Sequence, residues 1–124
     1  MIKLVYCVRR RADLSPADFY KYWHTQHAPK VKGVAKAIGA VKYIQSHTCA
    51  PDMNAMLKAS RGLKDPYDGI TEVWWESEAS MAAAISTPEG QAAMKLLLDD
   101  EANFIDFSDC AVFMTQEHGI FDYT

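Results

Sequence analysis

Two histidines, His24 and His27, stand three residues apart in a segment that also contains Trp23. In a helix that turns about 100° per residue, Trp23 and His27 fall on the same side, which predicts a buried His27. A buried imidazole is held neutral and can accept a proton near neutral pH. Enolisation or isomerisation beside a carbonyl group requires that chemistry. His27 is therefore the first candidate for a catalytic acid or base, and the alternative of a core or helix-capping histidine stays open.

His24 lies about 60° from His27 around such a helix, at the expected rim of the same pocket or on the surface. Two histidines at this spacing can also hold a metal ion, but a zinc site needs a third protein ligand. Only His47, Asp68 or Glu72 could supply that ligand, all from distant segments. We therefore expect no metal site.

Four aromatic side chains are further candidates for binding a substrate. Trp23 and Trp74 are suited to stacking on a flat molecule. The hydroxyl groups of Tyr6 and Tyr43 can hydrogen-bond to an enolate or phenolate oxygen. Each of the four also has an ordinary structural interpretation, because tryptophans fill cores and interfaces and tyrosines pack within sheets. Together with His24, they form the predicted substrate-binding set.

Glu72 is expected in the middle of a strand, between Ile70 and Trp74. A carboxylate at such a position is costly unless it is paired. Two interpretations stay open: Glu72 is a polar group of the pocket, or it is the partner of Lys42 or Arg61. On the first interpretation Glu72 joins the substrate-binding set.

The chain has 124 residues, of which 49% are hydrophobic and 23% charged, with a formal net charge of −3. These values are typical of a single domain with its own core. The acidic balance argues against nucleic acid as a partner, and the triplet at residues 9–11 is more typical of a solvated strand end. No apolar run is long enough to span a membrane.

The three cysteines are Cys7, Cys49 and Cys110. They are odd in number, widely spaced and form no C-x-x-C pair, so we expect reduced thiols. Lys3 interrupts the short apolar stretch at the N-terminus, and no signal-peptide pattern is present. Together these features predict a cytoplasmic protein.

Hydrophobic alternation predicts four strands, at residues 2–9, 41–48, 69–76 and 107–116. Ser15 and Pro16 are a strong helix start, and this helix should be disrupted at Pro29, with a second piece that stops at Gly39. Residues 49–68 form a long connection with one or two helical turns at residues 53–59. Further helices are expected at residues 78–86 and after residue 87.

This order, β-α-β followed by a long loop and a second β-α-β, predicts a ferredoxin-like α+β domain. Its βαββαβ chain forms a four-stranded antiparallel sheet with both helices on one face. The other face carries either Tyr6, Tyr43, Val73, Trp75 and Phe113 or their alternating neighbours. Both sets are too apolar to remain exposed to water, so this face must be covered. A second copy of the chain is the simplest cover, since two-fold homodimers are the commonest assemblies. Two such sheets face to face form a dimeric α+β barrel.

At this point the sequence resembles the EthD family of the dimeric α+β-barrel superfamily. The resemblance covers nearly the whole chain and is carried by residues 14–19 (LSPADF), 22–31 (YWHTQHAPKV), 66–74 (PYDGITEVW) and 100–106 (DEANFID). The stretch from Trp23 to Pro29 is the most specific part. Lys30 departs mildly from the family pattern, which has a leucine after His-Ala-Pro.

The resemblance implies a cofactor-free enzyme with a small-molecule substrate, held in a pocket between helices and sheet, and with His27 as the acid or base. Relatives of this kind isomerise lactones, or act on polyketide-type aromatic intermediates by tautomerisation, decarboxylation or dehydration. Two alternatives stay open. One is a cofactor-free monooxygenase or a haem-degrading enzyme on the same fold. The other is a non-catalytic ligand-binding or stress-response module.

Overall fold

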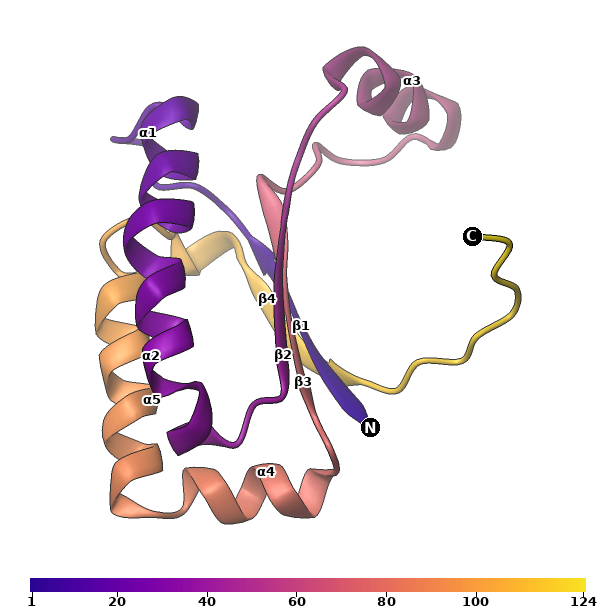
Figure 1. Cartoon of the computed structure of the whole chain (residues 1–124). Coiled ribbons are helices and arrows are strands. Elements are labelled where there is room, and N and C mark those ends of the chain that lie inside the picture. The colour runs from indigo at the N-terminus through magenta and orange to yellow at the C-terminus, as the bar shows by residue number, and fades with distance from the viewer.

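The computed structural model describes all of residues 1–124 and contains one four-stranded sheet with its helices (Figure 1). The strands are β1 (Ile2–Val8), β2 (Lys42–His47), β3 (Gly69–Trp75) and β4 (Ala111–Thr115). The helical segments are α1 (Pro16–Tyr22), η1 (Trp23–His27), α2 (Ala28–Ile38), α3 (Pro51–Arg61), α4 (Glu78–Ile85), α5 (Pro88–Glu101) and η2 (Phe107–Asp109). No helix combines the length and the apolar character that crossing a lipid bilayer requires.

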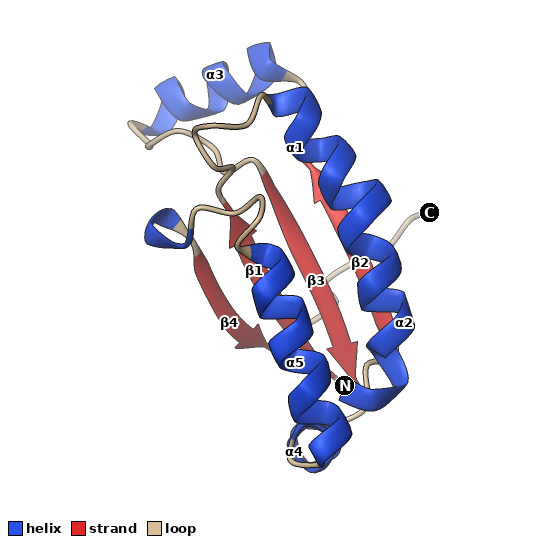
Figure 2. Cartoon of the chain, turned by 90° about the vertical axis from the view of Figure 1, so that its left-hand side faces the viewer, coloured by secondary structure: helices blue, strands red, loops and turns tan.

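The strands pair in the order β2-β3-β1-β4, and every neighbouring pair is antiparallel. Helices α1, α2 and α5 lie along one face of the sheet, while no helix lies flat on the opposite face (Figures 1 and 2). Helix α3 stands apart, beyond the upper end of the sheet (Figure 1). The expected ferredoxin-like α+β fold with a four-stranded antiparallel sheet is confirmed.

The helix that carries His27 continues through Pro29, so the expected disruption at that residue is wrong. Its middle segment, η1, is π-helical, and the Ala28 N–H donates to the Trp23 carbonyl five residues earlier. A π-turn is wider than an α-turn, so it accommodates the proline ring, which has no N–H to donate, at the start of α2. Gly39 then ends the helix with a φ of 74°, as the sequence predicts.

Two other boundaries differ from the sequence prediction. Helix α3 spans 11 residues rather than one or two turns, because Pro51 fits its first turn and Gly62, with a φ of 61°, ends it. The last strand begins at Ala111 rather than at Phe107. The 3-10 turn η2 occupies the intervening residues, and the Asp106 side chain caps it by accepting from the Ser108 N–H.

The strand register decides which residues face the helices. Tyr6 pairs with Thr71 and Tyr43 pairs with Val73, and all four lie on the helix side together with Trp75. The open face carries their alternating neighbours and Phe113: Lys3, Val5, Cys7, Lys42, Ile44, Ser46, Ile70, Glu72, Trp74, Ala111, Phe113 and Thr115. Placing Tyr6, Tyr43, Val73 and Trp75 on the open face is therefore wrong, and the alternative of their neighbours holds.

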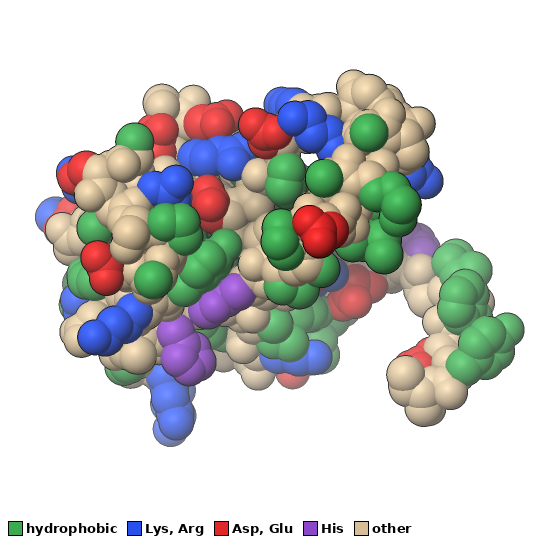
Figure 3. Space-filling view, turned by 90° about the horizontal axis from the view of Figure 1, so that it is seen from above, with side chains coloured by type: hydrophobic (Ala, Val, Ile, Leu, Met, Phe, Trp, Pro, Cys, Tyr) green, Lys and Arg blue, Asp and Glu red, His purple; other side chains and the backbone are tan.

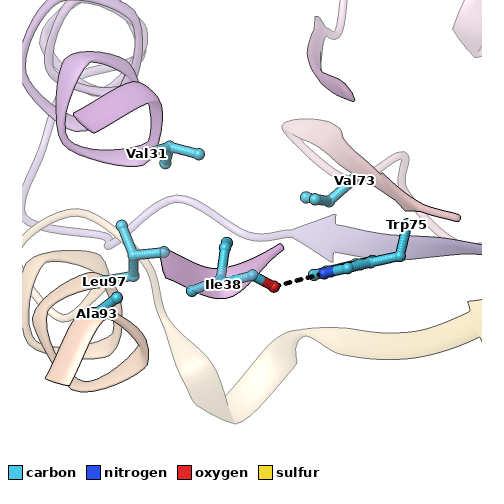
Figure 4. Close-up of a cluster of buried hydrophobic side chains, with 6 residues drawn as sticks. All are labelled: Val31, Ile38, Val73, Trp75, Ala93 and Leu97. Atoms are coloured by element: carbon cyan, nitrogen blue, oxygen red, sulfur yellow. Dashed lines mark hydrogen bonds between the residues drawn. The ribbon is translucent and has the colours of Figure 1, made fainter. Parts of the chain in front are cut away.

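Two buried clusters attach the helices to the sheet. Figure 4 shows the first, formed by Val31, Ile38, Val73, Trp75, Ala93 and Leu97. Within it, the Trp75 indole N–H donates to the Ile38 carbonyl oxygen at 2.7 Å. The second cluster contains Val8, Phe19, Trp23, Phe104 and Ile105. Because Trp23 is 1% exposed within this cluster, the packing fixes the π-helical turn that presents His27.

Candidate functional site

A cavity of about 480 Å³ lies between the helix layer and the sheet. Of its 18 lining residues, 14 are hydrophobic. The sheet contributes Leu4, Tyr6, Tyr43, Thr71, Val73, Trp75 and Val112, and the rest of the chain contributes Trp23, His27, Val31, Ile38, Met94, Lys95, Leu97, Leu98, Glu101, Ile105 and Phe107. An apolar cavity with a few convergent polar groups is the usual form of a small-molecule site.

His27 is the most buried titratable side chain of the cavity wall, with 6% of the residue exposed. Its Nδ1 lies 2.7 Å from Oδ2 of Asp100, a residue of α5. Its Nε2 has no hydrogen-bond partner in the protein. This atom is not fully buried, so a molecule in the site can reach it. The imidazole is therefore held at one nitrogen and open at the other.

Asp100 is the centre of a small hydrogen-bond network and is 5% exposed. Its Oδ1 accepts from the Tyr22 hydroxyl and from Lys30 Nζ, both at 2.6 Å, while Oδ2 faces His27. Burial acts to raise the pKa of Asp100, but hydrogen bonds from Lys30, Tyr22 and His27 outweigh it and lower the pKa to about 2. Asp100 is therefore ionised at neutral pH.

An ionised Asp100 fixes the protonation of the imidazole. A carboxylate only accepts hydrogen bonds, so His27 Nδ1 must carry the proton and Nε2 must carry the lone pair. Burial lowers the pKa of His27, and Asp100 opposes this effect only in part. At pH 7 His27 is thus a neutral ring whose free lone pair is able to remove a proton from a molecule in the cavity.

Glu101 and Tyr6 form a second polar group of the cavity. Burial raises the pKa of Glu101 to about 7; interaction with the Tyr6 hydroxyl acts against this rise, and the charge of Asp100 adds to it. Burial and the nearby charge of Glu101 raise the pKa of Tyr6 as well. The cavity therefore holds a carboxyl group whose pKa lies near neutral pH, next to a neutral phenol.

Tyr43 is tied to the turn that carries His27. Gln45 Nε2 donates to the Tyr43 hydroxyl at 2.8 Å and to the Trp23 carbonyl oxygen at 2.9 Å. This amide bridges β2 and η1. It holds the tyrosine hydroxyl and the π-helical turn in a fixed relation at the cavity wall.

The family model of the EthD domain matches residues 11–108, which is most of the chain. The chain belongs to the EthD family. The matched residues include the π-helical turn and the segment of α5 that carries Asp100 and Glu101.

Solved structures with the same fold include an EthD family protein from Bacillus halodurans, at 18% identity and a TM-score of 0.62, over 95% of this chain and 99% of that one. A dimeric ferredoxin-like protein of unknown function from Thermobifida fusca has 16% identity and a TM-score of 0.56, over 92% and 88%. SnoaB, a cofactor-independent oxygenase from Streptomyces nogalater, has 14% identity and a TM-score of 0.52, over 95% and 93%. At these identities the likeness concerns the fold. Comparison with curated proteins finds no match.

Two residues of the predicted substrate-binding set lie on the other side of the EthD sheet. Glu72 is on the open face, where Lys3 Nζ lies 2.8 Å from its carboxylate, so its partner is neither Lys42 nor Arg61. Trp74 is on the same face, and its indole N–H donates to Glu117 at 2.6 Å. Neither residue lines the cavity. The strand alternation separates them from His27, because successive side chains point to opposite faces.

The other predicted residues divide between the cavity and its surroundings. Trp23, Tyr6 and Tyr43 line the cavity with His27. His24 does not line it and instead lies with its ring centre 6.0 Å from that of His47. No group of three or more histidine, cysteine, aspartate or glutamate side chains is placed to hold a metal ion.

The sequence prediction missed the two carboxyl groups of α5. A local signal existed, because Asp100 lies three residues after Leu97 and seven after Ala93, which are apolar positions on the same side of the helix. The stretch of residues 100–106 also belongs to the segments that resemble the EthD family. What sequence spacing does not reveal is that Asp100 meets His27, which stands 73 residues earlier.

Proposed function

We propose that this EthD protein is a cofactor-free enzyme that moves a proton within a small carbonyl compound. The substrate is an aromatic, lactone or polyketide-like molecule, and the reaction is of the tautomerase, isomerase or decarboxylase type. One observation carries the proposal: His27 lines an apolar cavity as a neutral ring, bonded at Nδ1 to ionised Asp100 and with no protein partner at Nε2. That arrangement is suited to a general base.

In the proposed step, His27 Nε2 takes the proton from a carbon next to the substrate carbonyl. The C–H electron pair becomes a C=C bond, and the carbonyl electron pair moves to the oxygen. Asp100 stabilises the imidazolium ion that forms, because its carboxylate accepts from Nδ1. Hydroxyl groups in the cavity wall, such as those of Tyr6 and Tyr43, are suited to stabilise the oxygen as it gains charge.

Exchange of carbon-bound hydrogen with heavy water tests this proposal without knowledge of the natural substrate. The probe is 2-tetralone, an uncharged aromatic ketone with acidic hydrogens between ring and carbonyl. We expect the wild-type protein to accelerate deuterium uptake at that carbon, followed by proton NMR. We also expect the probe to raise the melting temperature, since a ligand at 100 times its Kd adds about 2.7 kcal/mol of stability. Binding without exchange would instead favour the ligand-binding module.

The second candidate is a cofactor-free oxygenase on the same cavity. It is motivated by the shared fold with SnoaB and by the His27 base, which is able to form an electron-rich enolate. Oxygen consumption with 2-tetralone or 1-naphthol separates the two candidates. Consumption that depends on His27 favours the oxygenase, whereas exchange at the same rate with and without air favours the isomerase. A spectral shift of added haem would test the haem-degrading version.

We also propose a homodimer formed through the open face of the sheet. This face carries exposed apolar side chains, including Ile44 (38% exposed), Ile70 (37%) and Phe113 (50%), and no helix covers it (Figure 1). A similar protein from Thermobifida fusca is described as dimeric. Acidic and basic side chains are interspersed over the end of the molecule seen in Figure 3, so this end forms no single-sign surface of the kind that binds nucleic acid.

Replacing Phe113 with glutamate should convert the dimer into a monomer. Phe113, on the edge strand β4, pairs with Val5 of β1 on the open face, so two such carboxylates would be buried without partners in a dimer. Analytical ultracentrifugation should give twice the mass of one chain for the wild type and a single mass for the variant. Leu96→Glu is the matched control, because Leu96 is 45% exposed on α5 and does not lie on the sheet. A wild type that sediments as a monomer contradicts the proposal.

A further inference from the structure

Glu101 is a second titratable side chain of the cavity. The proton transfer proposed for His27 and Asp100 does not use it. It follows Asp100 directly on α5, about 100° further around the helix. Asp100 therefore points to His27, while Glu101 lines the cavity together with Tyr6 from β1. Glu101 forms no ion pair with any lysine, arginine or histidine of the chain. A carboxyl group in apolar surroundings without a cation is costly in its ionised form.

The cavity also offers no free positive charge to a ligand. Lys95 is the only lysine or arginine among its lining residues. Its ammonium group lies 2.6 Å from the carboxylate of Asp99, and its side chain is 75% exposed. The ionised Asp100 behind His27 is paired with Lys30, whose ammonium group lies 2.6 Å from Oδ1, so Lys30 is not a free cation for a ligand either. A substrate carboxylate would lose its water on entry and gain no cation in return.

From these two observations we infer that Glu101, with the Tyr6 hydroxyl beside it, receives the carbonyl oxygen of the substrate, and that the substrate is an uncharged ketone, enol or lactone. The inference rests on the proposed proton transfer by His27. It narrows that proposal, because an uncharged substrate is suited to tautomerisation or isomerisation rather than decarboxylation.

The protonation of the site is consistent with this role. Burial raises the pKa of Glu101 to about 7, so a large fraction carries a proton at neutral pH and can donate it. Burial has the opposite effect on His27 and lowers its pKa, which keeps the imidazole neutral. One cavity thus holds a neutral base and a neutral acid, the combination that enolisation requires.

The proton balance of the step is complete. His27 Nε2 takes the proton from carbon, the C–H electron pair forms the C=C bond, and the carbonyl electron pair moves to oxygen. The oxygen takes the carboxylic proton of Glu101, which becomes a carboxylate. In the exchange assay the imidazolium N–H first exchanges with heavy water, and His27 then delivers a deuteron to the same carbon. In isomerisation His27 delivers its proton to a different carbon. In both cases the C=O bond re-forms and Glu101 takes back the oxygen-bound proton.

The first arm of the test compares Glu101→Gln with wild type in the 2-tetralone exchange assay. We expect a loss of about 10²-fold, since a glutamine amide cannot supply the proton. Wild-type activity should decline as pH rises through about 7, and this decline should be absent in the variant. Tyr6→Phe should move the decline to higher pH, because the Tyr6 hydroxyl lowers the pKa of Glu101. Glu89→Gln, an exposed position in the first turn of α5, is the matched control.

The titration of Glu101 must be distinguished from the titration of neighbouring groups. They are Tyr6 from β1, Tyr43 from β2, His27 from η1, and Lys95 and Asp100 from α5. Infrared spectroscopy distinguishes them, because only a protonated carboxyl group gives its characteristic C=O stretching band. Phenol, imidazole and ammonium groups have no such band. The wild type should lose one such band between pH 6 and pH 8, and Glu101→Gln should lose none. This readout does not depend on activity.

The second arm tests the charge of the ligand with two matched probes. We expect 2-naphthol, which is uncharged, to bind at least tenfold more tightly than 3-hydroxy-2-naphthoate, which carries a carboxylate. Tighter binding of the carboxylate overturns the inference about the substrate. Full exchange activity in Glu101→Gln together with its loss in His27→Gln overturns the role of Glu101 and leaves the proposed function intact. A wild type without exchange removes the proposed function, and the infrared and binding arms still decide on Glu101.

Discussion

Replacing His27 with glutamine is expected to slow deuterium exchange into 2-tetralone by roughly 10²- to 10⁴-fold, the usual contribution of a general base. Glutamine is close to histidine in size and keeps a polar end at the cavity wall, but it has no group that accepts a proton near neutral pH. Because the variant alters the reacting nitrogen and not the apolar walls, we expect 2-tetralone to bind it with an affinity within a few-fold of wild type. A loss of rate without a loss of binding marks His27 as the base.

The pH profile adds an independent test of the same residue. Burial lowers the pKa of His27, so the imidazole stays neutral below the ordinary histidine pKa of about 6.5. The acid-side decline of wild-type exchange should therefore lie below the ordinary histidine pKa of about 6.5. His118→Gln, an exposed position in the C-terminal tail, controls for the loss of a histidine elsewhere. Activity of His27→Gln within twofold of wild type would remove the residue from the mechanism.

How much of this site the sequence predicts depends on the range of the interaction. Trp23 and His27 share a side of one helix, so their spacing places both residues correctly at the buried side. Ser15 caps that helix by accepting from the Asp18 N–H, as its position before Pro16 predicts. Both features are local: each depends on residues within one or two turns of the same helix.

Features that depend on the other layer of the fold are not fixed by spacing. Both faces of β1 and β3 carry apolar side chains, so a period of two does not tell which set meets the helices. For this reason Trp74, and Glu72 on one of its two interpretations, are predicted in the pocket, whereas both residues lie on the open face. The network of Asp100 with His27, Tyr22 and Lys30 likewise joins α5 to residues that stand 70 to 78 positions earlier in the chain. Only the docking of the two helices brings these side chains together.

Pro29 shows a different reason for failure. The rule that proline disrupts a helix assumes the α-helical bond from each N–H to the carbonyl four residues earlier. In this chain the bond from Ala28 reaches back five residues, to Trp23, and the helix continues. A π-turn is rare enough that sequence patterns do not predict it, and such turns are frequent at functional sites. Here the turn carries His27.

Replacing Asp100 with asparagine is the second change with a large expected effect. It keeps His27 in place and changes the tautomer that its partner favours. Asparagine can turn its NH2 group toward His27 Nδ1, which favours the tautomer with the proton on Nε2. The nitrogen that faces the cavity is then no longer a base, and no carboxylate stabilises an imidazolium ion. We expect exchange into 2-tetralone to fall by roughly 10²- to 10⁴-fold although His27 is intact. Asp99→Asn, at the next position of α5, is the control, because Asp99 pairs only with Lys95.

The same substitution has a pH-dependent cost in stability. The folded pKa of Asp100 is lowered to about 2, against about 3.9 for an unfolded chain. A lowered folded pKa means that the stabilisation is fully present above about pH 5 and is lost as pH falls toward 2. Asp100→Asn should therefore lower the free energy of unfolding by roughly 2 to 3 kcal/mol at pH 7, measured by urea unfolding, and by less at pH 3. A difference between the two proteins that stays constant from pH 7 to pH 3 would show that the ionised carboxylate does not hold the network, and the tautomer of His27 would then lose its physical basis.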